Sequence, residues 1–435
     1  MNLCAHKIGL LLFSGLAMAA QAATNPLAYE NQTLALDGQQ VQARVPKGYR
    51  LEFLTGVLDG PRLLTFAPNG DLFIGSKSGK VYRLAPPYTT PQVLVTLDGY
   101  PHSVAFRKDE TANAPSLARG PRLDPIGEIL IARTDGLYRA AYKPGQAKLA
   151  PEAVTLLAAL PGGGGHNSRT VSVGPDGRVY ASLGIQGNCS DQYIGAGYSF
   201  DDRRGGILVL RDDSRDGGGR ATPGAVAGSD ARWEPYGSGL RNPVGFAWHP
   251  LTGVLYASNN GPDHSGFEQP PEYFSRIAPG SFHGMPWFQY DGKTLTRDDC
   301  IKRAPPRPLA DVTTPVATFP ARNAPMAVAF VSKGALEPAL EFDAIVALRG
   351  SWGTKPGGGF FGAAATRRHP KLVAVRFAGG DARRVDDLIT GFQLENGERW
   401  ARPVGVAVGP DGALYFTSDE ATQGLFRLKR ESPRR

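Results

Sequence analysis

Short runs of alternating apolar and polar residues recur along the chain, and each run is followed by a tight turn and a second run. The clearest copies read RLLTFAPNGDLFIGS from residue 62, RTVSVGPDGRVYASL from 169, VGFAWHPLTGVLYASN from 244 and VGVAVGPDGALYFTS from 404. Alternation with a period of two predicts strands, and Pro-Asn-Gly, Pro-Asp-Gly or Leu-Thr-Gly supplies the turn between them. The pattern therefore predicts a series of antiparallel strand pairs.

Two weaker copies complete the series. One consists of HSVAF at 102–106 and GEILIART at 127–134, and the other of MAVAFVSKG at 326–334 and FDAIVALRG at 342–350. A single copy cannot bury both of its faces, whereas sheets packed radially around an axis can. Repetition over the whole chain favours an all-β, six-bladed β-propeller of four-stranded antiparallel blades with loop insertions over the alternative, one or two β-sandwiches.

The N-terminal segment is typical of an export signal. A short positive region with Lys7 precedes an apolar run too short to span a membrane, and Ala20-Gln21-Ala22 forms a small-x-small cleavage site. We expect residues 1–22 to be a signal peptide and 23–435 to be a single propeller domain. The mature protein is then periplasmic or secreted, and it is not an integral membrane protein, because no later segment has the apolar length of a spanning helix.

Charge and cysteine content narrow the function classes. The net charge is +8, but the basic residues are dispersed apart from KRAPPRPLA at 302–310 and the tail RESPRR. Without a basic stripe interleaved with aromatic residues, nucleic acid is not an expected partner. Cys189 and Cys300 remain after processing, in no redox or metal-ligand spacing. An oxidising compartment permits a disulfide between them, but the sequence does not establish that they lie close together.

Residues that directly precede an innermost strand of a propeller line one mouth of its central channel. His166, Arg241 and Arg402 occupy this position before VSV, VGFAW and VGVAV. Four glycines precede His166, and glycine permits close backbone approach and unusual dihedral angles. Histidine exchanges a proton near neutral pH, so the pattern indicates a titratable group held at the channel mouth. The alternative is that His166 is a solvent-exposed histidine in a surface loop without a partner.

Oxygen-rich residues follow the Arg241 strand pair. Carbonyl and carboxylate oxygens on irregular backbone can bind a hard cation, although the spacing here is not that of an EF-hand. The alternative is a solvated acidic loop. The residues concerned are Asn260, Gly261, Pro262, Asp263, Glu268 and Glu272.

Several of these segments together resemble the soluble sugar dehydrogenases that depend on pyrroloquinoline quinone (PQQ), in particular the branch of glucose/sorbosone or L-sorbosone dehydrogenases. The resemblance runs in order from about residue 45 to 430. It is carried by PHSVAF, GGILVL, GLRNPVGFAWHPLTGVLYASNNGP, PPEYFSRIAPGSFHGMPW, VALRGSW and WARPVGVAVGPDGALYFTSDEATQGLFRL.

The resemblance implies a quinone lying over the channel mouth and a calcium ion bridging it to the protein. It assigns His166 as the general base and Gly261 and Pro262 as metal ligands through their carbonyls. The implied quinone contacts are Arg241, Asn242, Asn260, Arg349 and Arg402.

The activity expected from the resemblance is oxidation of an aldose or related, sorbosone-like sugar by hydride transfer to PQQ. The electron acceptor would be a cytochrome c or a membrane quinone. Two departures stand out: Ile185 occupies a position where some relatives have an acidic residue that orients the base, and DHSGFEQPPE follows Pro262. Asp191 replaces that acid only if its loop folds back.

Two other functions remain open. One is a propeller that binds a ligand or protein without redox chemistry. The other is a lactonase-like, metal-dependent hydrolase, which would need several inward carboxylates at equivalent positions of the blades, and the sequence does not place them there.

Overall fold

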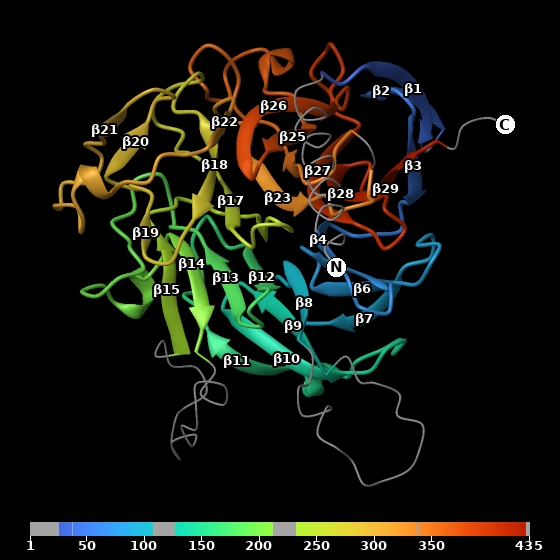
Figure 1. The fold of residues 1–435 in the computed structure, drawn as a ribbon, viewed down its shortest axis with the longest axis horizontal. Coiled ribbons are helices and arrows are strands. Elements are labelled where there is room, and N and C mark those ends of the chain that lie inside the picture. Colours follow the sequence, from blue (N-terminus) through green and yellow to red (C-terminus); the bar gives the residue numbers. More distant parts are fainter. Residues whose placement is uncertain (1–25, 37, 108–126, 212–231, 337–338, 432–435) are drawn as a thin grey trace, which may run out of the picture.

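Six β-sheets surround a central axis in the computed structural model, which describes residues 26–36, 38–107, 127–211, 232–336 and 339–431 (Figure 1). Each sheet is a four-stranded antiparallel blade, and the third blade carries one additional strand that pairs in parallel. The predicted six-bladed β-propeller is confirmed. The expected signal peptide, residues 1–22, lies outside the described residues.

The first three blades, each written from its innermost strand outward, are β4 (Pro61–Phe66), β5 (Leu72–Ser76), β6 (Lys80–Leu84) and β7 (Gln92–Thr96); β8 (Ser103–Arg107), β9 (Gly127–Arg133), β10 (Gly136–Tyr142) and β11 (Thr155–Ala159); and β12 (Arg169–Val173), β13 (Val179–Leu183), β14 (Gly206–Leu210) and β15 (Trp233–Ser238), with β19 (Ser281–Phe282) at the edge.

The last three blades are β16 (Phe246–Trp248), β17 (Leu255–Asn259), β18 (Glu272–Ile277) and β22 (Ala317–Phe319); β23 (Pro325–Phe330), β24 (Ala344–Leu348), β25 (Lys371–Ala378) and β26 (Asp381–Ile389); and β27 (Ala401–Val408), β28 (Leu414–Ala421), β29 (Gly424–Arg430) and β3 (Tyr49–Thr55). Outside the blades lie the pairs β1 (Tyr29–Leu36) with β2 (Gln39–Pro46) and β20 (Phe288–Tyr290) with β21 (Leu295–Arg297), and the 3-10 turns η2 (Pro151–Ala153), η3 (Phe200–Asp202), η5 (Leu309–Asp311) and η6 (Ala364–Thr366).

The ring is closed by strands from opposite ends of the chain. The N-terminal strand β3 pairs with the C-terminal strand β29, with Leu51 opposite Leu428 and Phe53 opposite Phe426. In Figure 1 the blue and red segments therefore lie in one blade. The sixth blade therefore contains strands from both ends of the chain, and it is complete only when β3 has paired with β29.

Each repeat seen in the sequence forms the two innermost strands of a blade. Alternating side chains of β5 face neighbouring blades: Phe73 packs against Phe106 and Tyr142 of the second blade, at centroid distances of 4.8 and 5.4 Å, while Leu72 and Ile74 pack towards the sixth blade. Two-sided burial explains why these strands are almost wholly apolar.

Small and hydroxyl residues in these strands join neighbouring blades. Ser258 Oγ donates a hydrogen bond to the Met326 carbonyl at 2.7 Å, and Thr417 Oγ1 donates to the Arg62 carbonyl at 2.6 Å. A Cβ at Gly245 would lie 2.2 Å from the Met326 carbonyl oxygen, so only glycine fits this blade-to-blade approach.

The innermost strands of all six blades line a central cavity of about 350 Å³. Leu63, Gly245 and Ala327 line this channel, and the residues directly before them in the chain, Arg62, Val244 and Met326, line a second cavity. The second cavity therefore lies at the N-terminal ends of the innermost strands, where the sequence places the candidate site. Within the described ranges, no helix has the length and apolarity needed to cross a membrane.

Candidate active site

The cavity at the channel mouth measures about 400 Å³, within the usual range for small-molecule and cofactor sites. It brings together most of the residues that the sequence singled out. Those that line it are His166, Arg241, Asn242, Asn260, Gly261 and Arg349. Arg402 and Pro262 are not among its lining residues.

The glycine run before His166 packs against the loop that follows β13. Gly164 has a φ of +83°, and a Cβ there would lie 2.5 Å from Cγ of Gln186. Gly165 donates its N–H to the Gln186 carbonyl at 3.1 Å, and a Cβ at Gly165 would lie 2.8 Å from that oxygen. The glycines are therefore needed for a close approach, which fixes the position of His166.

The imidazole of His166 is oriented by backbone. Its Nδ1–H donates a hydrogen bond to the Ile185 carbonyl, and the Ile185 N–H donates to the Arg241 carbonyl at 2.8 Å. This bond leaves Nε2 as the proton-accepting nitrogen. The Ile185 peptide thus supplies the orienting acceptor that its side chain lacks. Asp191 does not replace it, because its Oδ1 accepts a hydrogen bond from the Tyr198 hydroxyl at 2.9 Å.

His166 is held in its neutral form. Burial, followed by the positive charge of Arg241, lowers the pKa of His166 to about 4, and Arg169 and Arg204 add smaller contributions in the same direction. The Arg169 guanidinium donates at 2.8 Å to the His166 and Ser168 carbonyls rather than pointing into solvent. At neutral pH the Nε2 lone pair is therefore available to accept a proton.

Arg241 is buried between two loops. Its Nη2 donates to Asn188 Oδ1 at 2.6 Å and lies 3.7 Å from Asp263 Oδ2, and its Nη1 donates to the Asn260 carbonyl at 3.3 Å. Its buried Nε has no hydrogen-bond partner among the described residues. A buried donor without an acceptor is costly, so a change in the side-chain position of Arg241 on ligand binding would be favoured if it pairs Nε.

Asn242 and Asn260 are hydrogen-bonded to each other in the cavity wall. The Asn260 amide Nδ2 donates to the Asn242 carbonyl at 3.2 Å and to the Pro325 carbonyl at 2.6 Å. A Cβ at Gly184 would lie 2.6 Å from Asn242 Oδ1 and 2.8 Å from Cβ of His166. Because residue 184 is glycine, the side chains of His166 and Asn242 can both pack against its backbone in one wall of the cavity.

A buried carboxyl group lies beside Gly261. Glu272 is 3% exposed and accepts hydrogen bonds from the Gly261 N–H and, at 3.4 Å, from the Ala324 N–H. Burial raises the pKa of Glu272 to about 8, with the Asp263 charge adding to the effect and Arg241 opposing it. Glu268 lies elsewhere, paired with Arg368 and Lys355. Of the two glutamates noted in the sequence, Glu272 is the one in the cavity wall.

Three cationic side chains share one carboxylate on another wall. Arg62 Nη1 and Lys77 Nζ lie 2.6 and 2.7 Å from Asp419 Oδ2, and Arg349 Nε lies 2.8 Å from Asp419 Oδ1. Although burial acts to raise it, Arg62 and Arg349 hold the pKa of Asp419 far below its usual range. Sequence reasoning missed Arg62, yet Arg62 begins the first repeat just as Arg169 begins the third.

Arg402 lies behind this wall. It is 7% exposed, its Nε and Nη2 donate to the carbonyls of Arg349 and Gly350 at 3.0 Å each, and its Nη1 donates to Glu420 Oε2 at 2.6 Å. In this arrangement Arg402 holds the segment that presents Arg349 to the cavity. Its direct contact with a cofactor stays a prediction.

An aromatic side chain forms part of the rim. Trp352 lines the cavity and is 44% exposed, and its ring centroid lies 4.6 Å from that of Phe360, which is 74% exposed. Exposed aromatic faces beside a polar cavity suit the C–H surface of a sugar. In the sequence, Trp352 was noted only as the last residue of the motif VALRGSW.

The cavity is electropositive. Among the described residues that line it, the cationic side chains outnumber the carboxylates, which are Asp263 and Glu272. A positively charged wall beside one acidic corner suits an anionic ligand bound together with a cation. The cationic residues are Arg62, Lys77, Arg241, Arg322 and Arg349.

Comparison with known proteins gives a family. Residues 132–427, more than half of the chain, match the model of the glucose/sorbosone dehydrogenase family. The calcium structure of the Trichoderma reesei carbohydrate-active enzyme of family AA12 is similar, with a TM-score of 0.69, 17% identity, and 94% of this chain and 99% of that chain covered.

Two further solved structures share the fold. The holo form of the pyranose dehydrogenase PQQ domain from Coprinopsis cinerea has a TM-score of 0.65 and 20% identity, covering 90% of this chain and 97% of that chain. The apo form of the soluble aldose sugar dehydrogenase from Escherichia coli has a TM-score of 0.58 and 17% identity, covering 89% and 100%. The chain belongs to the glucose/sorbosone dehydrogenase family, and its propeller is that of an oxidoreductase acting on sugars.

Proposed function

We propose that the protein is an exported, PQQ- and calcium-dependent dehydrogenase of an aldose or related, sorbosone-like sugar, with its reaction centre in the cavity that contains His166. The observation that carries this proposal is a neutral histidine, fixed through Nδ1, in the wall of an electropositive cavity. The Coprinopsis cinerea relative is described as a holo form of a PQQ domain, and the Trichoderma reesei relative as a calcium structure.

The basic wall fits a planar tricarboxylate such as PQQ. The Nε atoms of Arg62 and Arg241 are buried and have no hydrogen-bond partner among the described residues, and both arginines line the cavity. Arg349 adds a third guanidinium there. Guanidinium groups bind carboxylates through short, charge-assisted hydrogen bonds, so these residues would hold the acidic groups of the quinone.

The acidic corner fits a calcium ion. Asp263 and Glu272 place carboxylate oxygens beside the Gly261 backbone, and these are the ligand types that Ca²⁺ prefers. Asp263 pairs with Arg241 and Arg322 in this structure, and the ion would take the place of these contacts. A divalent cation would also keep the buried Glu272 ionised, because an opposite charge favours the charged form. Gly261, Asp263 and Glu272 are therefore the residues that would hold the ion, with the Pro262 carbonyl as the remaining prediction from the sequence.

In the reaction, the protein removes the proton of the sugar hydroxyl and orients the sugar and the cofactor. When bound, PQQ would supply the hydride acceptor and calcium would supply Lewis acidity. His166 Nε2 accepts the proton of the sugar hydroxyl while the adjacent C–H bond gives up its hydride, and a C=O bond forms. A positioned general base contributes typically 10²–10⁴-fold. The Ile185 carbonyl steadies the resulting imidazolium through Nδ1–H.

The electron acceptor that restores the oxidised quinone is proposed to be a cytochrome c or a membrane quinone, reached in the periplasm or outside the cell. This proposal rests on the expected export signal and on the family of sugar oxidoreductases to which the chain belongs. The test is reduction of candidate cytochromes by the reconstituted, sugar-reduced enzyme.

The proposal is tested by reconstitution. Purified protein is titrated with PQQ in the presence and absence of Ca²⁺, and sugars are screened for reduction of an artificial dye. Sugar-dependent dye reduction that needs both additions, and that a chelator abolishes until calcium is restored, is the expected result. Saturable PQQ binding without dye reduction by any sugar would indicate the non-redox binding propeller instead. Lactone hydrolysis that needs metal but no quinone would indicate the hydrolase.

A further inference from the structure

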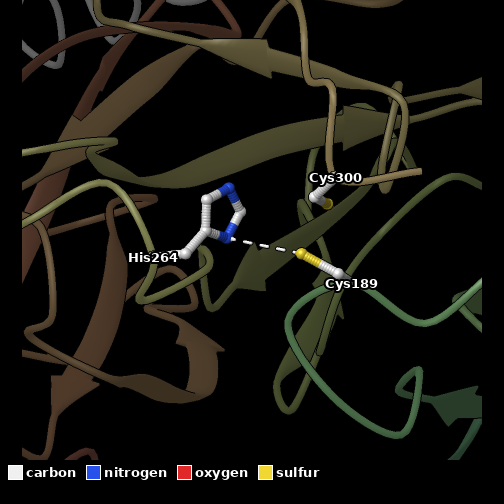
Figure 2. Close-up of side chains that lie close together, drawn as sticks. All are labelled: Cys189, His264 and Cys300. Carbon is white, nitrogen blue, oxygen red and sulfur yellow. Dashed lines mark hydrogen bonds between the residues drawn. The ribbon is translucent and has the colours of Figure 1, made fainter. Parts of the chain in front are cut away.

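A second cluster of ligand-type side chains lies beside the candidate active site. Cys189, His264 and Cys300 converge from three loops, and one ligand atom from each lies within 4.8 Å of the others (Figure 2). Cys189 follows β13, His264 lies between β17 and β18, and Cys300 follows β21. Their separation in the chain explains why no spacing motif in the sequence revealed them.

The imidazole of His264 is oriented as in a metal site. Its Nε2–H donates to Asp298 Oδ2 at 2.9 Å, which leaves Nδ1 as the lone-pair nitrogen, and Nδ1 lies 3.8 Å from Cys189 Sγ. Metal-binding histidines commonly donate their other N–H to a carboxylate in this way. Asp298 is itself held, by Gln289 Nε2 at 2.8 Å and by the Cys300 N–H at 3.0 Å.

The separation suits a tetrahedral ion. With Zn–S near 2.3 Å and Zn–N near 2.0–2.1 Å, neighbouring ligand atoms of a tetrahedron lie about 3.6–3.8 Å apart. The observed 3.8 Å between Nδ1 and Sγ is about 0.2 Å longer than the N–S edge of such a tetrahedron, and all three ligand atoms lie within 4.8 Å of one another, so small side-chain rotations bring them onto one ion. Both cysteines are free thiols in the structure, and a disulfide between them would make no use of the lone pair that His264 directs at Cys189.

We propose that Cys189, His264 and Cys300 form a zinc site with two thiolates, one imidazole and a fourth position open to solvent. Sulfur and imidazole ligands favour Zn²⁺ over the oxygen-seeking Ca²⁺ of the neighbouring cavity. Binding releases the two thiol protons to solvent. The exposure of Cys189 and His264 leaves room for a water as the fourth ligand.

The site would connect two loops of the active-site cavity. Asn188, next to Cys189, accepts a hydrogen bond from Arg241 Nη2 at 2.6 Å and from the Asp263 N–H at 3.1 Å. Asp263, next to His264, also faces Arg241. A metal ion across Cys189 and His264 would therefore fix the two side chains, those of Asn188 and Asp263, that contact Arg241, a cavity residue in the loop between β15 and β16.

The test is metal binding by the full-length mature protein without quinone, kept reduced with a phosphine. Zinc is titrated in competition with a chromophoric chelator, and Co²⁺ is used as a spectroscopic substitute. We expect one equivalent of zinc per chain and a thiolate-to-cobalt charge-transfer band with tetrahedral d–d absorption. Asp298→Asn should weaken zinc binding by about 10–100-fold, the usual effect of losing the partner of a ligating histidine.

Variants decide the assignment. Cys300→Ser and His264→Asn should lose the charge-transfer band and the stoichiometric zinc, whereas His369→Gln, an exposed histidine elsewhere, should keep both. Thermal melting of each apo variant shows whether it is folded. The proposal is overturned if reduced wild-type protein takes up no zinc, or if Cys300→Ser binds zinc as tightly as wild type. It is also overturned if protein isolated without reductant holds Cys189 and Cys300 as a disulfide. Because no quinone or sugar is used, these results are independent of the dehydrogenase assignment.

Discussion

The protonation state of His166 is the most sharply defined electrostatic consequence of the site. A pKa of about 4 lies roughly 2.5 units below the usual value for histidine, which corresponds to about 3 kcal/mol against charging the ring. At pH 5 the ring would be about 90% neutral, whereas an unperturbed histidine would be about 3% neutral. Neutral imidazole is lost only as the pH falls through about 4.

Nitrogen NMR of protein labelled in histidine measures this directly. Below pH 7, in protein without added quinone, we expect the His166 ring to keep a protonated Nδ1 and an unprotonated Nε2 down to about pH 4.5, as the Ile185 carbonyl requires. Burial also lowers the pKa of His102 and of His283, so more than one ring stays neutral in this range and the His166 signal has to be assigned. His166→Gln assigns the signal by removing it, and His369→Gln, which alters an exposed ring, should leave it unchanged. A midpoint near 6.5, or the opposite tautomer, would refute the reasoning from burial and from Arg241.

The remaining predictions concern the ion, the basic wall and blade packing. Glu272→Gln should weaken calcium-dependent activation by roughly 10-fold or more, because the ion loses an anionic ligand; an unchanged half-saturating calcium concentration would exclude Glu272 from the site. Arg349→Gln should raise the PQQ dissociation constant by about 10–100-fold, the range for hydrogen bonds to charged groups. Arg402→Ala should raise it less while turnover at saturating quinone stays near native, since Arg402 supports the Arg349 backbone; equal or reversed effects in binding titrations would show that Arg402 itself contacts the quinone. Gly245→Ala should destabilise the fold by about 1–3 kcal/mol, because its Cβ would meet the Met326 carbonyl at 2.2 Å; calorimetry showing an unchanged melting temperature would contradict the close packing of these blades.

Local pattern was sufficient to predict the blades but not how the ring closes. Each repeat contains its own strands and turn, so alternation and Pro-Asp-Gly identify it without knowledge of distant contacts. The pairing of β3 with β29 joins residues from the two ends of the chain, and nothing in the local pattern of either strand specifies the other. The same applies to the short pair β20–β21, which lies within a long insertion.

The site was predictable where a residue's position relative to an innermost strand determines its place. This rule led to His166 and Arg241, which line the cavity, and applied to every repeat it would have led to Arg62. It also led to Arg402, which lies within β27 and behind the cavity wall, because its guanidinium is bonded to the Arg349 and Gly350 carbonyls and to Glu420. The orienting group of His166 was not predictable, because it is the carbonyl of Ile185 and a backbone group carries no signature in the side chain. Asp419 was missed for a related reason: its partner Arg62 lies 357 residues away in the chain.

The most direct test of the proposed function is a single-turnover measurement of PQQ reduction by sugar in wild-type protein and in His166→Gln, each saturated with quinone and calcium. Stopped-flow absorbance reports the reduction rate, and equilibrium titration reports quinone binding on the same samples. We predict near-native quinone affinity in the variant and a reduction rate lower by about two to four orders of magnitude, the usual contribution of a general base. A variant that binds quinone normally and reduces it at the wild-type rate would contradict the assignment of His166 as the base.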